Sequence, residues 1–108
     1  MATDELGDVG TRRLFENERV RVWEMLLEPG ERSAKHQHEL DYLLIFFEGE
    51  RITLEVDPAS DGPYRDSLDF DVPLGRCVFV ERGGVETAVN TGATRYREIL
   101  IELKDSGV

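Results

Sequence analysis

The chain has only two histidines, His36 and His38, and a single residue separates them. In an extended strand, residues i and i+2 project from the same face, so both imidazoles should point into one shared space. Neutral imidazole is the commonest protein ligand for zinc, copper, iron and nickel. The pair therefore predicts half of a metal site. The alternative is a metal-free pair that hydrogen-bonds within a polar pocket.

The elements that must carry this pair are strands. Apolar stretches recur along the chain between Gly, Pro, Asn and Asp, and none has the i, i+3, i+4, i+7 spacing of a helix. Strands are expected at residues 11–16, 19–28, 42–48, 51–57, 68–72, 76–82, 85–90 and 95–104. Many short strands at regular spacing predict an all-β sandwich or barrel, the jelly roll being one closure that manages its edge strands.

One connection between strands is short enough to suggest how they pair. Gly49 and Glu50 separate the apolar strand 42–48 from the alternating strand 51–57. A two-residue connection that contains Gly predicts a β-hairpin. The segment 58–66 is rich in Asp, Ser, Gly and Pro, and we expect it to be an exposed loop.

Strand parity also predicts the lining of a pocket. Tyr42 has the parity of His36 and His38, so its ring should face the same interior. We expect the Tyr42 hydroxyl to bond a ligand or a bound water, as buried tyrosines commonly do. Leu44 and Phe46 continue this parity and would make the deeper wall of the pocket apolar.

Other apolar residues are assigned to the core. Trp23, Met25 and Phe79 are expected there, and each could also reach the pocket. Cys77 precedes an apolar run and is expected to be a buried, inert thiol. Because it is the only cysteine, an internal disulfide is impossible, which excludes an extracellular disulfide framework.

Length and charge exclude several classes of protein. The 108 residues fit one domain, with flexible ends expected at 1–10 and 105–108. The formal net charge of −10 argues against nucleic acids and anionic membranes as partners, since both attract clustered Lys and Arg. Residues 1–10 lack the apolar stretch of a signal peptide, and the apolar run 42–47 is too short to span a bilayer. A cytoplasmic protein is expected.

Two blocks punctuated by glycine carry a family resemblance. The first contains Gly30, His36, His38, Tyr42 and Gly49, and the second contains Gly75, Glu81, Gly83, Glu86 and Asn90. Their spacing resembles the two motifs of the cupin superfamily over about residues 19–103. The run from His36 to Tyr42 further resembles small single-domain cupins associated with β-alanine degradation. The resemblance implies a double-stranded β-helix, or jelly-roll β-barrel, and a homodimer.

The chain departs from the cupin pattern at ligand positions. The pattern has Glu where Tyr42 stands, His where Glu86 stands and Pro where Glu81 stands, so only His36 and His38 remain of its usual ligands. Glu86 could restore a carboxylate from the opposite strand, which would give the two-His, one-carboxylate triad of non-haem iron enzymes. Alternatively, Glu86 is an exposed loop residue. A shift of one residue would bring Thr87, a poor ligand, to the site.

Three functions follow from the resemblance. The first is a metal-dependent enzyme, an oxygenase, isomerase or hydrolase, that holds Fe, Mn, Ni or Zn and acts on a small, carboxylate-bearing molecule inside the barrel. The second is a non-catalytic cupin that binds or senses a small ligand at a degraded, metal-free site. The third is a structural dimer with an empty barrel. For the dimer interface we expect the segments 19–27 and 98–103, with an internal position in the fold as the alternative for both.

The remaining polar residues are given structural roles. Asn90 is expected in a turn. Glu39 and Asp41 have the parity opposite to the histidines and should be solvated. Four arginines could pair with a carboxylate substrate, although a surface role is expected for each: Arg51, Arg76, Arg82 and Arg95.

Overall fold

The structure of the chain is a computed structural model that describes residues 5–104, and within them it has nine β-strands and no helix. The strands are β1 (Arg12–Glu16), β2 (Val20–Leu27), β3 (His36–Gln37), β4 (Tyr42–Glu48), β5 (Arg51–Val56), β6 (Leu68–Asp71), β7 (Cys77–Val80), β8 (Val85–Val89) and β9 (Tyr96–Leu103). Eight of them coincide with predicted strands to within two residues at either end. The ninth, β3, is the short strand that begins at His36.

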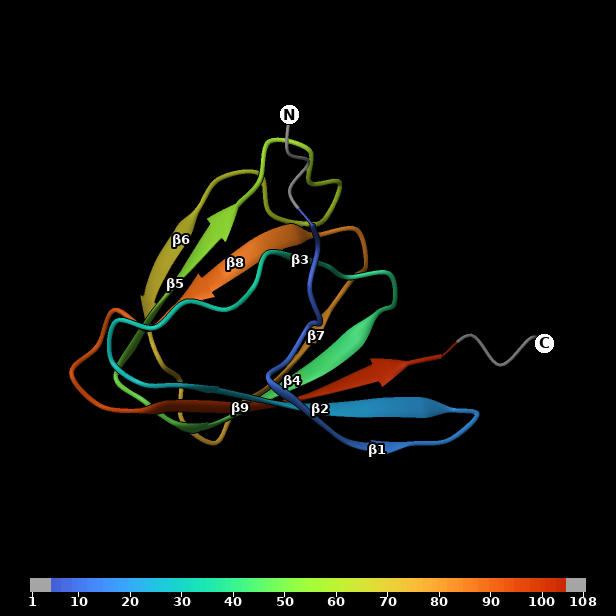
Figure 1. Ribbon diagram of the computed structural model, residues 1–108, viewed down its shortest axis with the longest axis horizontal. Coiled ribbons are helices and arrows are strands. Elements are labelled where there is room, and N and C mark those ends of the chain that lie inside the picture. Colours follow the sequence, from blue (N-terminus) through green and yellow to red (C-terminus); the bar gives the residue numbers. More distant parts are fainter. Residues whose placement is uncertain (1–4, 105–108) are drawn as a thin grey trace.

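The strands form two antiparallel sheets that face each other (Figure 1). One sheet has the order β1-β2-β9-β4-β7 and the other the order β3-β8-β5-β6. From β6 onward, successive strands alternate between the sheets, as in a jelly roll. The predicted all-β class is confirmed. Within residues 5–104, however, no strand pair joins the two sheets, so they do not close into a continuous barrel.

The hairpin predicted at Gly49 and Glu50 is wrong. The preceding strand, β4, pairs with β7 and β9, whereas the following strand, β5, pairs with β6 and β8. The connection is therefore a corner where the chain passes from one sheet to the other. Gly49 has φ +132°, and a Cβ at this position would lie 2.9 Å from the Tyr96 ring, so both its conformation and its packing require glycine.

The core lies between the sheets and consists of two apolar clusters. The larger cluster contains Met25, Leu27, Phe46, Ile52, Ala88 and Tyr96, and the smaller one contains Val9, Trp23, Tyr42, Val80 and Leu100. In β9 the side chains alternate strictly between buried and half-buried positions. Trp23 and Met25 are thus in the core as predicted.

Two residues predicted to be buried are exposed. Phe79 is 57% exposed, and Cys77 is also on the surface. The strand that carries them, β7, pairs only with β4 and forms the edge of its sheet. Alternation turns Val78 and Val80 toward the core, which leaves Cys77 and Phe79 on the outer face of this edge strand.

The N-terminal residues 5–10, which the sequence predicts to be flexible, lie against the sheets. Val9 is buried in the smaller cluster, and the Gly7 N–H donates to the Lys35 carbonyl at 2.8 Å. The other predicted flexible positions, 1–4 and 105–108, fall outside the described residues. No helix in the described part of the chain is long and apolar enough to cross a membrane.

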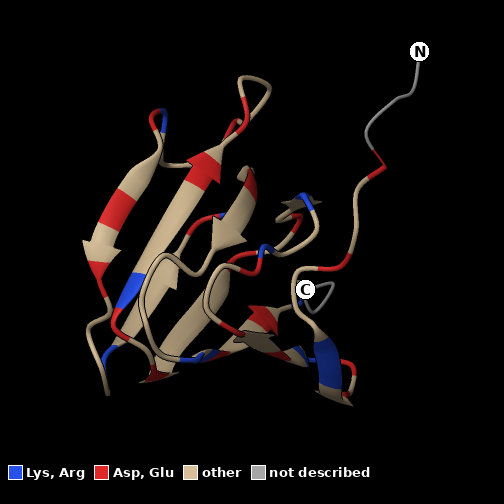
Figure 2. Ribbon diagram, turned by 60° about the vertical axis from the view of Figure 1, so that its left-hand side comes forward, with Lys and Arg blue, Asp and Glu red and all other residues tan. Residues whose placement is uncertain are grey.

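Most charged residues lie on the surface, and the buried exceptions within residues 5–104 are Glu24, Glu86, Glu98 and Glu102. Figure 2 shows the acidic residues at turns and strand ends throughout the molecule. Three of the four arginines considered as carboxylate partners form ion pairs: Arg51 with Asp69 and Asp71, Arg82 with Asp41, and Arg95 with Glu48. The fourth, Arg76, is exposed, so the expected surface role is confirmed for all four.

Asn90 is a buried turn residue. Its side-chain amide donates to the carbonyls of Leu27 and Thr94, both at 2.9 Å, and its oxygen accepts from the Gly92 N–H at 3.0 Å. The side chain is almost fully buried, with 1% exposed. It therefore ties the turn between β8 and β9 to the end of β2.

Replacing Asn90 with Ala should lower the free energy of unfolding by about 2–4 kcal/mol, because the buried Leu27 carbonyl and the partly buried Thr94 carbonyl lose their donor. Chemical denaturation measures this change. Asn17→Ala is the control, since Asn17 also accepts turn hydrogen bonds, from Arg19 and Val20, but at an exposed site. If Asn90→Ala lowers the free energy of unfolding no more than Asn17→Ala does, the structural role assigned to the buried amide is contradicted.

Candidate metal centre

The pairing of β3 with β8 places His36 directly opposite Glu86. The backbone ladder continues beyond β3: the His38 N–H donates to the Gly84 carbonyl, and the Gly83 N–H donates to the His38 carbonyl, both at 2.8 Å. Because His36 and His38 lie two residues apart on this extended segment, both rings face the same side as Glu86. The structure thus has both imidazoles pointing into one shared space, as their spacing predicts.

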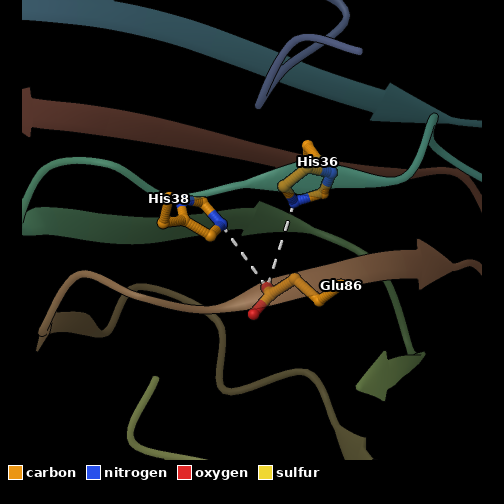
Figure 3. A group of neighbouring side chains, drawn as sticks. All are labelled: His36, His38 and Glu86. Carbon is orange, nitrogen blue, oxygen red and sulfur yellow. Dashed lines mark ion pairs between the residues drawn. The ribbon is translucent and has the colours of Figure 1, made fainter. Parts of the chain in front are cut away.

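The three side chains converge (Figure 3). The Nε2 atoms of His36 and His38 lie 4.0 Å and 3.5 Å from Oε2 of Glu86. One donor atom from each residue falls within 4.8 Å of the other two, and all three side chains are buried. The structure places Glu86, and not Thr87, at this point. Thr87 lies opposite Glu55 of β5.

Hydrogen bonding and burial prepare His36 for a metal. Its Nδ1 lies 2.8 Å from the Ala34 carbonyl, and since a carbonyl only accepts, the proton sits on Nδ1. The lone pair is then on Nε2, the nitrogen that faces Glu86. Burial, and next the proximity of His38, lower the pKa of His36 below its usual value. The ring is therefore neutral at pH 7, the form that binds metals.

His38 is held by stacking instead of by a hydrogen bond. Its ring lies on the Tyr42 ring, with centroids 4.1 Å apart and an angle of 19° between the planes. Its Nδ1 is the one buried side-chain nitrogen or oxygen within residues 5–104 that has no hydrogen-bond partner. An unpaired buried polar atom costs about 1–3 kcal/mol. Such a cost is typical of a position that function, more than stability, has selected.

Two glycines precede β8, and one of them makes room for the Glu86 carboxylate. A Cβ on Gly84 would lie 2.7 Å from Oε1 of Glu86, so any larger residue would displace the carboxylate. Gly83 has φ +111° and a Cβ there would lie 2.8 Å from the Asp61 carbonyl. Gly84 is thus part of the site, whereas Gly83 is required by the conformation and close packing of the turn.

These residues fit a divalent metal ion. Two ligands bound about 2.1 Å from one ion lie roughly 3.0–3.5 Å apart. The histidine Nε2 atoms lie 3.5 Å and 4.0 Å from Oε2 of Glu86, close to this range. Small side-chain rotations would bring the donor atoms to the distances that a shared ion requires. Two imidazoles and one carboxylate suit iron, manganese, nickel or zinc. Three protein ligands also leave coordination positions open, as catalytic sites require.

The cluster lies on the wall of a cavity of about 200 Å³ between the two sheets. Tyr42, Leu44 and Phe46 line this cavity from β4. The facing sheet contributes Leu54 and Phe70, so most of the wall is apolar. The four arginines considered above are not among the residues that line it. Met25 reaches the cavity too, whereas Trp23 does not.

Sequence reasoning missed two polar residues of this cavity, Tyr96 and Glu98 of β9. The Tyr96 hydroxyl donates to the Glu98 carboxylate, which is buried. Burial, and secondarily the charge of Glu86, raise the pKa of Glu98 to about 7. Alternation offers no signal for Glu98, because Ile99 and Ile101 share the opposite face of β9, and that apolar face would be expected to be the buried one.

Replacing Glu98 with Gln should make stability less sensitive to pH. In the unfolded chain the carboxyl ionises near its ordinary pKa of 4.5, but in the folded chain only near 7, so wild-type stability falls as pH rises through this window. The variant has no such loss. Between pH 4 and pH 8, the free energy of unfolding of the variant should therefore rise on the order of 3 kcal/mol relative to that of wild type.

Urea denaturation at the two pH values measures the gain. Glu81→Gln removes one exposed carboxylate from the surface and serves as the control for net charge. A variant-to-wild-type difference that is the same at pH 4 and pH 8 would show that Glu98 is not held protonated by the fold.

The fold has solved relatives. The chain is similar to a cupin domain from Bordetella pertussis Tohama I, with a TM-score of 0.72 and 23% identity over 92% of this chain and 100% of the other. A cupin of the RmlC-like family from Methanocaldococcus jannaschii has a TM-score of 0.66 and 16% identity, over 99% of this chain and 94% of the other. A Cupin 2 conserved barrel domain protein from Salinispora arenicola has a TM-score of 0.63 and 20% identity, over 89% of this chain and 75% of the other.

These likenesses are of structure and not of close sequence. No protein-family profile and no curated protein sequence matches the chain. The narrower resemblance to cupins of β-alanine degradation is not confirmed and stays a prediction. The two facing antiparallel sheets and these neighbours agree with the expected jelly-roll arrangement. The chain therefore has the cupin fold, the double-stranded β-helix.

Proposed function

We propose that the protein is a metal-dependent enzyme of the cupin type, in which His36, His38 and Glu86 hold one divalent ion. The observation that carries this proposal is the convergence of three buried donor groups on the wall of an internal cavity. The ion would be Fe, Mn, Ni or Zn, which this set of ligands suits. The substrate would be a small molecule with a carboxylate or carbonyl group directed at the ion.

The protein's own groups would prepare the site for chemistry. A bound divalent ion acts as a Lewis acid toward a substrate oxygen or water, which serves oxygenation, isomerisation and hydrolysis alike. The Ala34 carbonyl orients His36, and the Tyr42 ring orients His38. The apolar wall excludes water and so strengthens electrostatic interactions inside the cavity. Since no arginine lines the cavity, a substrate carboxylate would depend on the ion for its counter-charge.

A second candidate is a non-catalytic cupin that binds or senses a small ligand without metal. The observation in its favour is the unpartnered Nδ1 of His38. Metal-bound histidines almost always donate their other ring nitrogen to a partner, and loss of such a partner typically costs 10–100-fold in affinity. Metal content separates the two functions. For either one we propose the cytoplasm as the location, because a lone, exposed Cys77 suits a reducing compartment.

Protein purified without a His-tag and reconstituted with Fe, Mn, Ni or Zn should bind about one ion per chain. His36→Ala should abolish binding, because two donors do not hold an ion in competition with water. Glu86→Gln should weaken it at least tenfold, since the carboxylate supplies the only negative ligand. Elemental analysis gives the stoichiometry, and isothermal titration calorimetry gives the affinity.

Two neighbouring residues provide matched controls. Gln37 lies between the histidines with its side chain exposed, and Thr87 follows Glu86 with its side chain half-buried. Gln37→Ala and Thr87→Ala should both retain the wild-type stoichiometry. Wild-type protein that holds far less than one equivalent after reconstitution would rule out the enzyme and favour the metal-free binding function.

We also propose that the protein is a homodimer formed through the outer face of the five-stranded sheet. The strands expected at the interface are β2 and β9, which lie side by side in that sheet. Two cross-strand rows run over the outer face: Val22, Ile101, Leu43 and Phe79 in one, and Glu24, Ile99, Ile45 and Cys77 in the other. Glu24 is ion-paired with Arg12 and Arg97, and the other members of the two rows carry no charge. A two-fold axis would place these uncharged residues against their own copies.

Phe79→Asp should convert the dimer to a monomer, because it would bury a charge in an apolar interface. Sedimentation equilibrium measures the mass. The control is Leu74→Asp, which adds the same charge at an exposed position on the turn before β7 and should leave the dimer intact. A wild-type protein that sediments with the mass of one chain at tens of micromolar would refute the dimer.

A further inference from the structure

The buried carboxyl of Glu98 belongs to the cavity but not to the proposed metal ligands. It lies on the inner face of β9, opposite Met25 of β2 and Phe46 of β4 in the strand register. Both neighbours line the same cavity, as does Leu100, the next inward residue of β9. Its neighbours across both strand pairs are therefore apolar.

The hydrogen bonding of Glu98 leaves half of its carboxyl for a ligand. The Tyr96 hydroxyl donates to Oε1, and this is the one hydrogen bond to the Glu98 side chain within the described residues. No ion pair in that part of the chain involves Glu98. Oε2 is not among the fully buried atoms that lack a partner, so it retains access to the cavity.

The surroundings of Glu98 favour its neutral, protonated form. The titratable groups that act on it are Tyr96 on its own strand, Glu86 of β8 and Tyr42 of β4. None of these is a cation. The strands β2, β5 and β6 present only apolar side chains to the cavity. A buried carboxyl without a cationic partner keeps its proton, and with Oε1 engaged by Tyr96, that proton is available on Oε2.

We propose that Glu98 is a second recognition group of the cavity, whose Oε2–H donates a hydrogen bond to a carbonyl oxygen of a small, otherwise apolar ligand. The proposal deepens the proposed function, and it rests on that function only in placing the reactive end of the ligand at His36, His38 and Glu86. An ammonium group is disfavoured as the partner, because the apolar wall would not compensate its lost hydration.

Three one-ring compounds of similar shape test the proposal on protein stripped of metal with a chelator at pH 6. Acetophenone has an acceptor oxygen, ethylbenzene has no polar group, and benzylamine has a cation. Titrations followed by NMR should show acetophenone binding about three- to tenfold more tightly than ethylbenzene, the effect of one net hydrogen bond. Benzylamine should bind no better than ethylbenzene.

Two variants assign the preference to the proton of Glu98. Glu98→Gln keeps a donor in the side-chain amide and should keep the preference for acetophenone. Glu98→Met has a side chain of similar length without a donor and should bind acetophenone and ethylbenzene equally. If the Met variant does not fold, wild type and Glu98→Gln are compared at pH 9, where wild type should lose its preference and the Gln variant should keep it.

Several results would overturn the proposal. They are equal binding of acetophenone and ethylbenzene by wild type, tighter binding of benzylamine, no binding of any probe at millimolar concentration, and a preference that survives in Glu98→Met. Metal content distinguishes this failure from that of the proposed function. Glu98→Met should bind metal as wild type does, and a loss of metal would place Glu98 among the ligands instead. A wild type without metal that still prefers acetophenone would refute the metal site alone.

Discussion

The cross-strand pair of His36 and Glu86 is the constraint on which the site depends. It brings together a motif near the start of the chain and a carboxylate far along it, and the backbone bonds from His38 to Gly83 and Gly84 extend the register past β3. A shift of one residue would turn Glu86 away and present Thr87. Everything polar in this part of the cavity therefore depends on two strands that are only two and five residues long.

The distribution of acids divides the molecule into two electrostatic regions. Outside, carboxylates such as Asp41 and Asp69 pair with arginines, which lower their pKa values. Inside, burial among apolar side chains, and secondarily the charge of Glu86, raise the pKa of Glu98, and the hydrogen bond from the Tyr96 hydroxyl offsets only part of this rise. The high net negative charge thus reflects the surface, while the cavity keeps one acid in its neutral form. This contrast gives the interior a hydrogen-bond donor that composition would not suggest.

Much of this structure could be predicted from alternation along single strands, and much less from connections between them. Parity placed Tyr42, Leu44 and Phe46 on the inner face of β4, where the cavity lies. It could not say that β7 is an edge strand, so Phe79 was assigned to the wrong environment. A short turn at Gly49 does not reveal whether its flanking strands pair with each other or with distant partners. Glu98 was overlooked for the same reason, because the inner face of β9 depends on which strands cover it.

The passage of the chain from sheet to sheet has a consequence for how the molecule forms. Apart from β1 with β2 and β5 with β6, the strand pairs join segments that are not successive in sequence, and His36 meets Glu86 across 50 residues. Closing such distant loops is slow, because chain entropy is lost before the contacts form. The donor groups therefore meet only once most of both sheets exist. Partly folded chains would lack the site altogether, so ligand binding reports on complete folding.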